Sequence, residues 1–295
     1  MENISKNLHP RNKFNKVYNI EQLAKNTPDL RKFVVQVDHD HLSIDFTQPE
    51  AVFHLNKALL KTTYGIKGWR VLPKSLVPTV PGRLNYIHYL ADLLGGKTGR
   101  GVHILDIGTG SSIIYPILGV KEYGWLFTGS ETHVPSLTNG NAILKDNPEL
   151  AKSIRLRQQS NPKNILKDII LPKEYYDAIM CNPPFFKSQE DHEAQVSRKN
   201  KNLRISQDAN SNYQGLSTEL WTDGGEKKFI TQLIYDSFTY KDQIGYCTTL
   251  VSNKENIKPL RAILEYHKVK DIQVINMSQG NKINRILAWK LSDKK

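Results

Sequence analysis

The stretch "VHILDIGTGSS", residues 102–112, decides the fold of this 295-residue chain. Its first half, "VHILDI", is mostly apolar and has the length of a buried strand. Gly108 and Gly110 then allow a tight turn whose backbone a ligand can approach closely. The following residues, "SSIIYPILGVKEYG", predict a helix with Pro116 near its first turn. A buried strand, a glycine-rich turn and a helix form the opening unit of an α/β sheet.

The same alternation of strand and helix continues to residue 291. Such alternation predicts a mostly parallel sheet with helices on both faces. Seven strands ending in an antiparallel pair is the arrangement of Rossmann-like class I methyltransferases. We expect further strands at 125–131, 153–159, 175–182, 244–252, 269–277 and 285–291, and helices at 135–148, 226–240 and 257–267.

The part before this unit has a different pattern. Residues 1–47 are polar and irregular, a helical spacing of apolar residues begins at Pro49, and Pro73 and Pro78 break the chain before a helix restarts near Arg83. We therefore expect an N-terminal extension over residues 1–80 and a catalytic domain over 81–295.

Composition favours a polyanionic partner. The chain has 41 Lys and Arg against 29 Asp and Glu, a formal charge of +12, which suits nucleic acid; general surface solubility is the alternative. Cys181 and Cys247 lie in apolar runs and predict buried thiols. No signal peptide, membrane-spanning run or metal-ligand spacing is visible, so we expect a cytoplasmic protein without a metal.

The glycine turn predicts a cofactor site. "DIGTGSS" lacks the GxGxxG of dinucleotide sites, and Asp-x-Gly-x-Gly is usual in enzymes that bind S-adenosylmethionine; an ordinary tight turn is the alternative. Glu131 ends the second strand, where an acid can accept both ribose hydroxyls. We expect Asp106 to organise the loop or meet the methionine amino group. Asn164, after the third strand, is placed to meet the adenine.

The stretch "CNPPFF", residues 181–186, follows the fourth strand and predicts the chemistry. The Asn182 side-chain oxygen and the Pro183 carbonyl can each accept an N–H from the exocyclic amine of a base. Pro183 and Pro184 make this corner rigid, and Phe185 offers a face for stacking. A plain strand-ending turn is the alternative. The motif does not distinguish adenine from guanine, and enzymes that modify glutamine amides use a similar corner.

Together with further motifs, these residues resemble the 23S ribosomal RNA adenine-N6 methyltransferases and, more distantly, their eukaryotic relatives that methylate adenine in small nuclear RNA. The matching stretches are "LHPRNKF" (8–14), "SIDFTQPEAV" (43–52), "VPTVPGRLNYIHYLADLL" (77–94), "DIGTGSSIIYPILG" (106–119), "CNPPFF" (181–186), "ELWTDGGE" (219–226), "TTLVSNKENI" (248–257) and "SQGNKINRILAW" (278–289).

The resemblance implies S-adenosylmethionine as methyl donor and an RNA-binding N-terminal extension. It makes Arg83, Gly108, Ser112, Glu131 and Asn182 similar to cofactor-binding positions, with Arg83 facing the methionine carboxylate. Asn182 to Phe185 would hold the target adenine. The chain departs from the family in "GSETH", where bacterial members often carry a further Asp, which leaves the second ribose contact open.

Three basic groups are candidates for RNA contact. The first lies in the N-terminal extension, the second in an acid-free stretch that we interpret as a lid, and the third near the turn of the closing hairpin. A solvated loop and a plain hairpin turn are the alternatives for the last two. The residues are His9, Arg11, Lys13 and Lys16; Arg198, Lys199, Lys201 and Arg204; and Lys282 and Arg285.

Three functions therefore remain. The first is an RNA adenine-N6 methyltransferase acting as a monomer on 23S ribosomal RNA or a large-subunit assembly intermediate. The second is a guanine-N2 or DNA methyltransferase, against which "LHPRN" argues. The third is a non-catalytic RNA-binding protein on the same fold, against which the joint presence of "DIGTG", Glu131 and "NPPF" argues.

Overall fold

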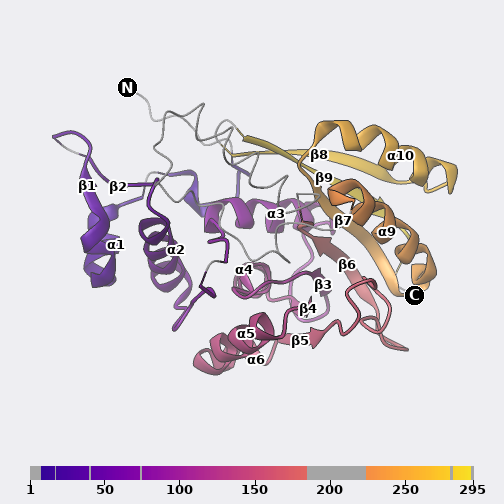
Figure 1. Ribbon diagram of the computed structural model, residues 1–295, viewed down its shortest axis with the longest axis horizontal. Helices are drawn as coiled ribbons and strands as arrows, with labels where there is room; N and C mark the ends of the chain where they lie inside the picture. Colours follow the sequence, from indigo (N-terminus) through magenta and orange to yellow (C-terminus); the bar gives the residue numbers. More distant parts are fainter. Residues whose placement is uncertain are drawn as a thin grey trace.

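The computed structural model describes residues 8–16, 18–39, 41–73, 75–184, 224–279 and 282–293. Its centre is a seven-stranded sheet with the order β5-β4-β3-β6-β7-β9-β8 (Figure 1). The strands are β3 (His103–Ile107), β4 (Leu126–Glu131), β5 (Ile154–Gln158), β6 (Tyr176–Cys181), β7 (Ile244–Val251), β8 (Ile272–Gln279) and β9 (Lys282–Lys290).

The sheet is parallel from β5 to β7 and antiparallel beyond it. β9 pairs with both β7 and β8, so the strand that comes later in the chain lies inside β8. β6, at the middle of the sheet, is buried at every residue, as expected for a strand covered on both faces. The predicted Rossmann-like class I methyltransferase fold with a closing antiparallel pair is confirmed.

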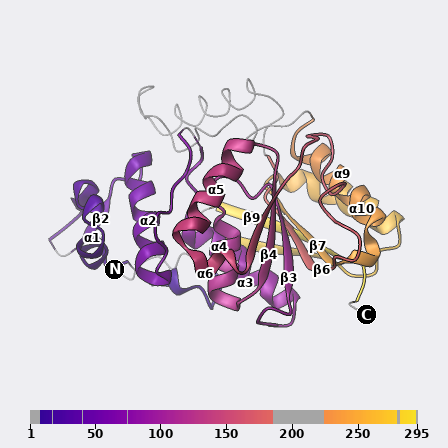
Figure 2. The same ribbon diagram turned by 90° about the horizontal axis from the view of Figure 1, so that it is seen from below.

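Helices cover both faces of the sheet (Figure 2). Alternate strand residues enter two separate hydrophobic clusters: Ile104 and Met180 join one, and Leu105 and Ile179 join the other. The first cluster is covered by α3 (Val80–Leu93), α4 (Ile114–Tyr123), α5 (Val134–Asp146) and α6 (Pro148–Ala151), and the second by α9 (Gly225–Thr239) and α10 (Ile257–Tyr266).

The N-terminal segment is more regular than its sequence predicts. It contains α1 (Ile20–Asn26), a hairpin of β1 (Val34–Gln36) and β2 (Leu42–Ile44), α2 (Pro49–Tyr64), and the 3-10 turns η1 (Lys13–Asn15) and η2 (Pro28–Phe33). The expectation of irregular chain over residues 1–47 is therefore wrong for the described part. These elements project from one side of the sheet (Figure 1). Their buried side chains, such as Leu23 and Leu55, join the same cluster as α3.

Two expectations about single features can be compared with the structure. Cys181 and Cys247 are free and buried, as predicted. Within the described ranges, no helix has both the length and the apolar character needed to cross a bilayer. The short turns η3 (Lys241–Gln243) and η4 (Lys254–Asn256) precede β7 and α10.

Candidate active site

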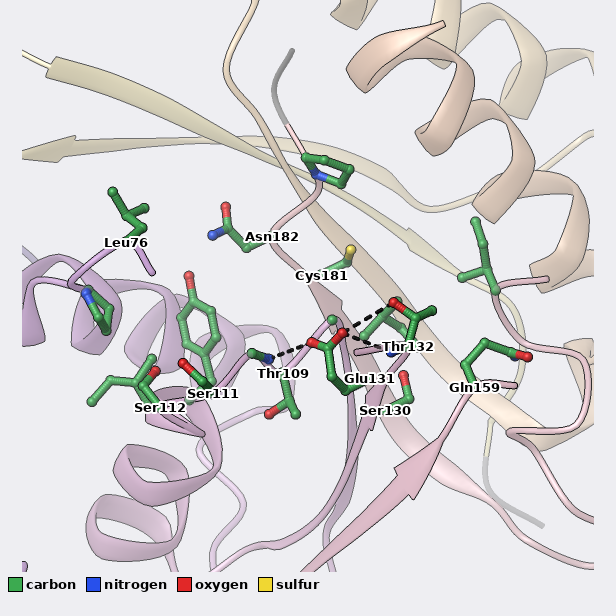
Figure 3. Close-up of a pocket in the computed structure, with 18 of the residues that line it drawn as sticks. Leu76, Thr109, Ser111, Ser112, Ser130, Glu131, Thr132, Gln159, Cys181 and Asn182 are labelled. Carbon is green, nitrogen blue, oxygen red and sulfur yellow. Dashed lines mark hydrogen bonds between the residues drawn. The ribbon is translucent and has the colours of Figure 1, made fainter. Parts of the chain in front are cut away.

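A pocket of about 280 Å³ opens at the carboxyl ends of β3, β4 and β6 (Figure 3). Ligands bind at this edge in doubly wound sheets, because the loops after the strands converge there. Most of the residues predicted for the cofactor and the base line this one pocket. They are Arg83, Gly108, Gly110, Ser112, Glu131, Asn164, Asn182 and Pro184.

The glycine loop forms one wall of the pocket. Gly108 and Gly110 have φ values of 68° and 66°, in the left-handed region that an L residue adopts only at a cost. A Cβ atom on Gly108 would have no atom within 4 Å, so the backbone conformation, not the space, requires glycine there. The Ser112 carbonyl accepts a hydrogen bond of 3.2 Å from the Trp69 indole, which fixes the loop to the N-terminal segment.

Glu131 lies across from this loop and holds it in place. Its Oε2 accepts a hydrogen bond of 3.0 Å from the Gly110 amide, and its Oε1 accepts one of 2.8 Å from the Thr132 amide (Figure 3). Oε1 also accepts a bond of 2.9 Å from the His133 amide. The side chain thus organises the loop, a role that the sequence assigned to Asp106. A carboxylate oxygen accepts more than one bond, so Oε2, with one hydrogen bond within the described residues, is able to accept a ribose hydroxyl as well.

Asp106 is buried in β3, directly before the pocket-lining residues Ile107 and Gly108. Its carboxylate is 1% exposed, and neither oxygen has a hydrogen-bond partner among the described residues. Burial raises the pKa of Asp106 to about 7; the nearby Thr109 hydroxyl opposes this shift, the charge of Glu131 adds to it, and the charge of Arg83 opposes it. A buried carboxylate in this state is stabilised by a cationic ligand. This environment fits an ammonium group.

Arg83 projects from the first turns of α3 into the same pocket. Its guanidinium lies 5.6 Å from the centroid of the Tyr115 ring, and Nη1 donates a 3.4 Å hydrogen bond to the Tyr115 hydroxyl. No carboxylate in the described part of the chain forms an ion pair with it. A guanidinium held by stacking can still bind a carboxylate with its remaining donors.

Asn182 closes the pocket on the side of β6. Its Oδ1 is buried and has no hydrogen-bond partner among the described residues. Buried acceptors are nearly always paired, so an open one facing a pocket indicates a missing donor. Pro184 lines the pocket and Pro183 is buried behind it. Phe185 lies outside the described residues.

The structure corrects the prediction for His9. The imidazole is 5% exposed, and its Nε2 lies 2.8 Å from Asp92 Oδ2. The His9 amide donates a 2.9 Å hydrogen bond to Asn85 Oδ1. A buried ring that already contacts a carboxylate has no free face for a phosphate, so His9 fixes the N-terminal segment to α3.

The neighbouring basic residues also contact the protein itself. Arg11 Nη2 lies 2.6 Å from Asp92 Oδ1, and Lys13 Nζ lies 2.8 Å from Glu122 Oε1. Both acids stand at the carboxyl ends of α3 and α4, whereas Arg83 reaches the pocket from the other end of α3. Lys16 is exposed. For Arg11, Lys13 and Lys16, RNA contact stays a prediction.

The third predicted basic group lies nearer the pocket. Arg285 is half-buried in β9, opposite Val251, and Lys282 begins the same strand. Because β9 runs antiparallel to β7, this end of β9 adjoins the carboxyl end of β7. RNA contact by Lys282 and Arg285 stays a prediction. Arg198, Lys199, Lys201 and Arg204 lie outside the described residues.

Several pocket residues were not expected from the sequence. Tyr115 stacks on Arg83, Thr132 supports Glu131, and Gln159 directly follows β5. Only Gln159 carried a signal, since polar residues that follow parallel strands gather at one edge. The apolar part of the pocket wall includes Leu76, Pro78, Ile165 and Phe229.

Comparison with known proteins agrees with this geometry. The family model described as RNA methyltransferase matches residues 2–293. The chain is 44% identical to ribosomal RNA large subunit methyltransferase F of Salmonella paratyphi A, over 97% of this chain and 94% of that protein. It is 43% identical to the protein of the same name from Flavobacterium johnsoniae, over 96% and 93%.

Solved structures show the same likeness. The chain is similar to the catalytic domain of human METTL16 in complex with hairpin 1 of the MAT2A 3'UTR, with 32% identity, a TM-score of 0.85 and coverage of 97% and 96%. It is also similar to the N-terminal domain of human METTL16 in complex with SAH, with 29% identity, a TM-score of 0.77 and coverage of 97% and 99%. Because the family model spans nearly the whole chain, the chain belongs to this family of RNA methyltransferases.

Proposed function

We propose that this protein transfers a methyl group from S-adenosylmethionine to the 6-amino group of one adenine in 23S ribosomal RNA. The names of the 43–44% identical relatives support a large-subunit ribosomal RNA substrate. The SAH in a similar solved structure supports the cofactor. The resemblance of the motifs to adenine-N6 methyltransferases supports the choice of base.

The open polar groups of the pocket fit S-adenosylmethionine. Arg83 would bind the methionine carboxylate, and Asp106 would face the ammonium, since each lacks an ionic partner within the described residues. Glu131 Oε2 would accept a ribose hydroxyl. Asn164 would meet the adenine, beside the apolar side chain of Ile165. The bound sulfonium supplies an electrophilic methyl group.

At the other side of the pocket, Asn182 would hold the target amine. Its side-chain oxygen and the Pro183 carbonyl would each accept one amino N–H, which turns the nitrogen lone pair toward the pocket. The two prolines hold these acceptors still before the base arrives, so little reorganisation remains in the transition state. Asn182 is neutral and is not a general base. The amino proton leaves to water after transfer.

The observation that carries this proposal is that, among the described residues, the Asn182 oxygen has no hydrogen-bond donor and Arg83 and Asp106 have no ionic partner. The test is methylation of 23S ribosomal RNA by the purified protein with labelled S-adenosylmethionine, followed by mass spectrometry of the nucleosides. N6-methyladenosine is expected. Detection of N2-methylguanosine would indicate guanine as the target base. RNA binding without transfer of the labelled methyl group would indicate a non-catalytic protein.

The natural form of the substrate can be tested in the same assay. We propose that the protein acts in the cytoplasm, as a monomer, on 23S ribosomal RNA or a large-subunit assembly intermediate. Its formal charge of +12 suits either. Naked RNA, assembly intermediates and mature subunits should be compared at one salt concentration. The form that gives the highest kcat/KM is the substrate, and equal rates on all three would contradict a preference for an intermediate.

A further inference from the structure

Helix α3 presents a second side chain on the same side as Arg83. Tyr86 follows three residues later, a spacing that places two side chains on one helix face. Tyr86 is fully buried, and its hydroxyl lies 2.8 Å from Thr248 Oγ1 in β7. The same hydroxyl oxygen lies 3.4 Å from the backbone nitrogen of Cys181, the residue before Asn182. No step proposed above uses Tyr86 or Thr248.

The directions of these hydrogen bonds follow from the available protons. Thr248 Oγ1 donates its hydrogen to the Ile179 carbonyl at 2.8 Å. Thr248 therefore has no proton left for Tyr86, so the Tyr86 hydroxyl donates to Thr248. The Tyr86 oxygen then accepts the Cys181 amide proton. The chain of bonds runs from Cys181 N–H through Tyr86 and Thr248 to the Ile179 carbonyl.

These bonds lie where the pairing of β6 with its two neighbouring strands changes. The pairing of β6 with β7 ends at Ile179 opposite Cys247, whereas its pairing with β3 continues to Cys181 opposite Ile107. On its β7 side, the regular pairing of β6 thus ends two residues before the strand does, although β7 itself continues to Val251. Buried backbone N–H groups require a partner. The two hydroxyls supply one at the residue before the NPPF corner.

We propose that Tyr86 and Thr248 are positioning residues that fix the direction of Asn182. The proposal rests on the function proposed above. Neither residue lines the pocket. The Tyr86–Thr248 bridge holds the end of β6 against α3, and α3 also carries Arg83. One rigid helix would therefore position both the cofactor carboxylate and the Asn182 corner. It would thereby fix the distance between the methyl donor and the acceptor nitrogen. Misplacement of reacting groups by about 1 Å can cost on the order of 100-fold in rate.

The test removes the hydroxyl and keeps the ring. Tyr86→Phe should lower the single-turnover rate, at saturating S-adenosylmethionine and RNA, by about 10- to 100-fold. Affinity for S-adenosylmethionine, measured by calorimetry, should stay within about twofold, because the cofactor contacts remain. Thr248→Val should act in the same direction with almost no change in shape. Thr248→Ser keeps the hydroxyl and should keep most of the rate.

Tyr176→Phe is the matched control. Tyr176 is also fully buried and begins β6, the strand that ends at Cys181. Its hydroxyl lies 3.3 Å from Thr128 Oγ1. It should lower the melting temperature and leave the rate of the folded protein unchanged. A wild-type rate in both Tyr86→Phe and Thr248→Val would overturn the proposal, as would an equal loss of rate in Tyr176→Phe.

A second readout does not depend on activity. Hydrogen exchange of the peptide containing residues 179–182 should become at least about tenfold faster in Tyr86→Phe and should change little in Tyr176→Phe. Unchanged exchange would overturn the inference even if the enzyme were slow. An inactive wild-type protein would overturn the proposed function instead, and the exchange experiment would still decide whether Tyr86 holds the corner.

Discussion

Two asparagines of this protein have buried side-chain oxygens with opposite surroundings. Asn85 Oδ1, in α3, accepts hydrogen bonds from the His9 amide at 2.9 Å and from Asn12 Nδ2 at 2.8 Å. Asn182 Oδ1 accepts none from the described residues. Asn85 lies in the stretch "VPTVPGRLNYIHYLADLL" and Asn182 in "CNPPFF", both of which carry the resemblance to the family. The difference shows that one motif is satisfied within the fold and the other is open for a ligand.

The satisfied region is a clamp between residues 8–12 and α3. Asn12 Nδ2 also donates to the Pro81 carbonyl at 2.9 Å, and Arg11 Nη2 donates to the His88 carbonyl at 3.1 Å. The motifs "LHPRN" and "PGRLNYIH" are thus joined by hydrogen bonds. They fix the N-terminal segment to α3, the helix that carries Arg83 and Tyr86.

The comparison predicts opposite results for the two asparagines. Asn182→Ala should lower the methylation rate by about 100- to 1,000-fold and leave the melting temperature nearly unchanged, because it removes one preorganised contact to the reacting amine. Asn85→Ala should do the reverse. It leaves the His9 amide and one of the two Asn12 Nδ2 protons without an acceptor, which costs roughly 1–3 kcal/mol for each group. Single-turnover kinetics and thermal melts of both variants measure the two effects.

Asn182→Asp sharpens the first half of this test, since it keeps an oxygen at the same place and should keep partial activity. Near-wild-type turnover of a folded Asn182→Ala protein would rule out the open-acceptor mechanism. A large loss of turnover per folded Asn85→Ala molecule would place the clamp in the catalytic machinery.

The unpaired Asp106 predicts a pH dependence of stability. Its pKa is about 7 in the folded protein and 3.8 ordinarily, because burial disfavours the charge. The stability that it contributes is therefore complete below pH 4 and is lost as the pH rises to 7, by on the order of 4 kcal/mol. Denaturant melts of the cofactor-free protein should show this fall and Asp106→Asn should lack it. The control is Asp177→Asn, because Asp177 Oδ2 already accepts from the His103 amide at 2.9 Å; it should keep the fall.

Two buried glutamates extend the comparison to the cofactor. Glu131→Ala should weaken S-adenosylmethionine binding by roughly 1.5–3 kcal/mol, the range for hydrogen bonds to a charged group. Glu226, at the start of α9, is bonded to Ser252 N at 2.6 Å and Asn256 Nδ2 at 2.7 Å and does not line the pocket. Glu226→Ala should therefore lower stability and spare the affinity. If calorimetry shows equal S-adenosylmethionine affinity in the two variants, Glu131 does not bind the cofactor.

The smallest expected effect concerns Arg11, Lys13 and Lys16, the basic residues of the N-terminal segment. The sequence alone predicts that neutralising Arg11, Lys13 and Lys16 flattens the salt dependence of RNA binding by about two to three units of slope. The ion pairs of Arg11 and Lys13 reduce that expectation. The Arg11→Gln, Lys13→Gln double variant should change the slope by less than about 0.5, and Lys16→Gln by about 0.7–0.9. Binding titrations over a salt series separate them, and a larger change in the double variant would restore direct RNA contact.

The core of the fold and most of the pocket could be predicted because their signals are local. A strand, a glycine turn and a helix occupy adjacent residues, and acids or amides that follow parallel strands must meet at one edge. Gly108, Glu131 and Asn182 therefore gather as expected. The short elements α1, β1 and β2 were missed because seven or three residues are too few to show a period.

The remaining errors concern partners far away in the chain. The sequence shows that His9 is a basic residue but does not show whether its partner is a phosphate or Asp92, which lies 83 positions later. Tyr86 and Thr248 are separated by 162 positions, and nothing near either residue predicts the other. The double role of Glu131, toward the Gly110 amide and toward the pocket, also required the geometry.

The place of β9 in the sheet has a consequence for synthesis on the ribosome. β9 lies between β7 and β8, and its residues from Ile286 to Trp289 are fully buried. Until this strand has been translated, β8 has no partner in the sheet and β7 exposes an edge. The nascent chain must therefore wait for residues 282–290 before its sheet closes, and we expect a chain that stops before β9 to be captured by chaperones or degraded.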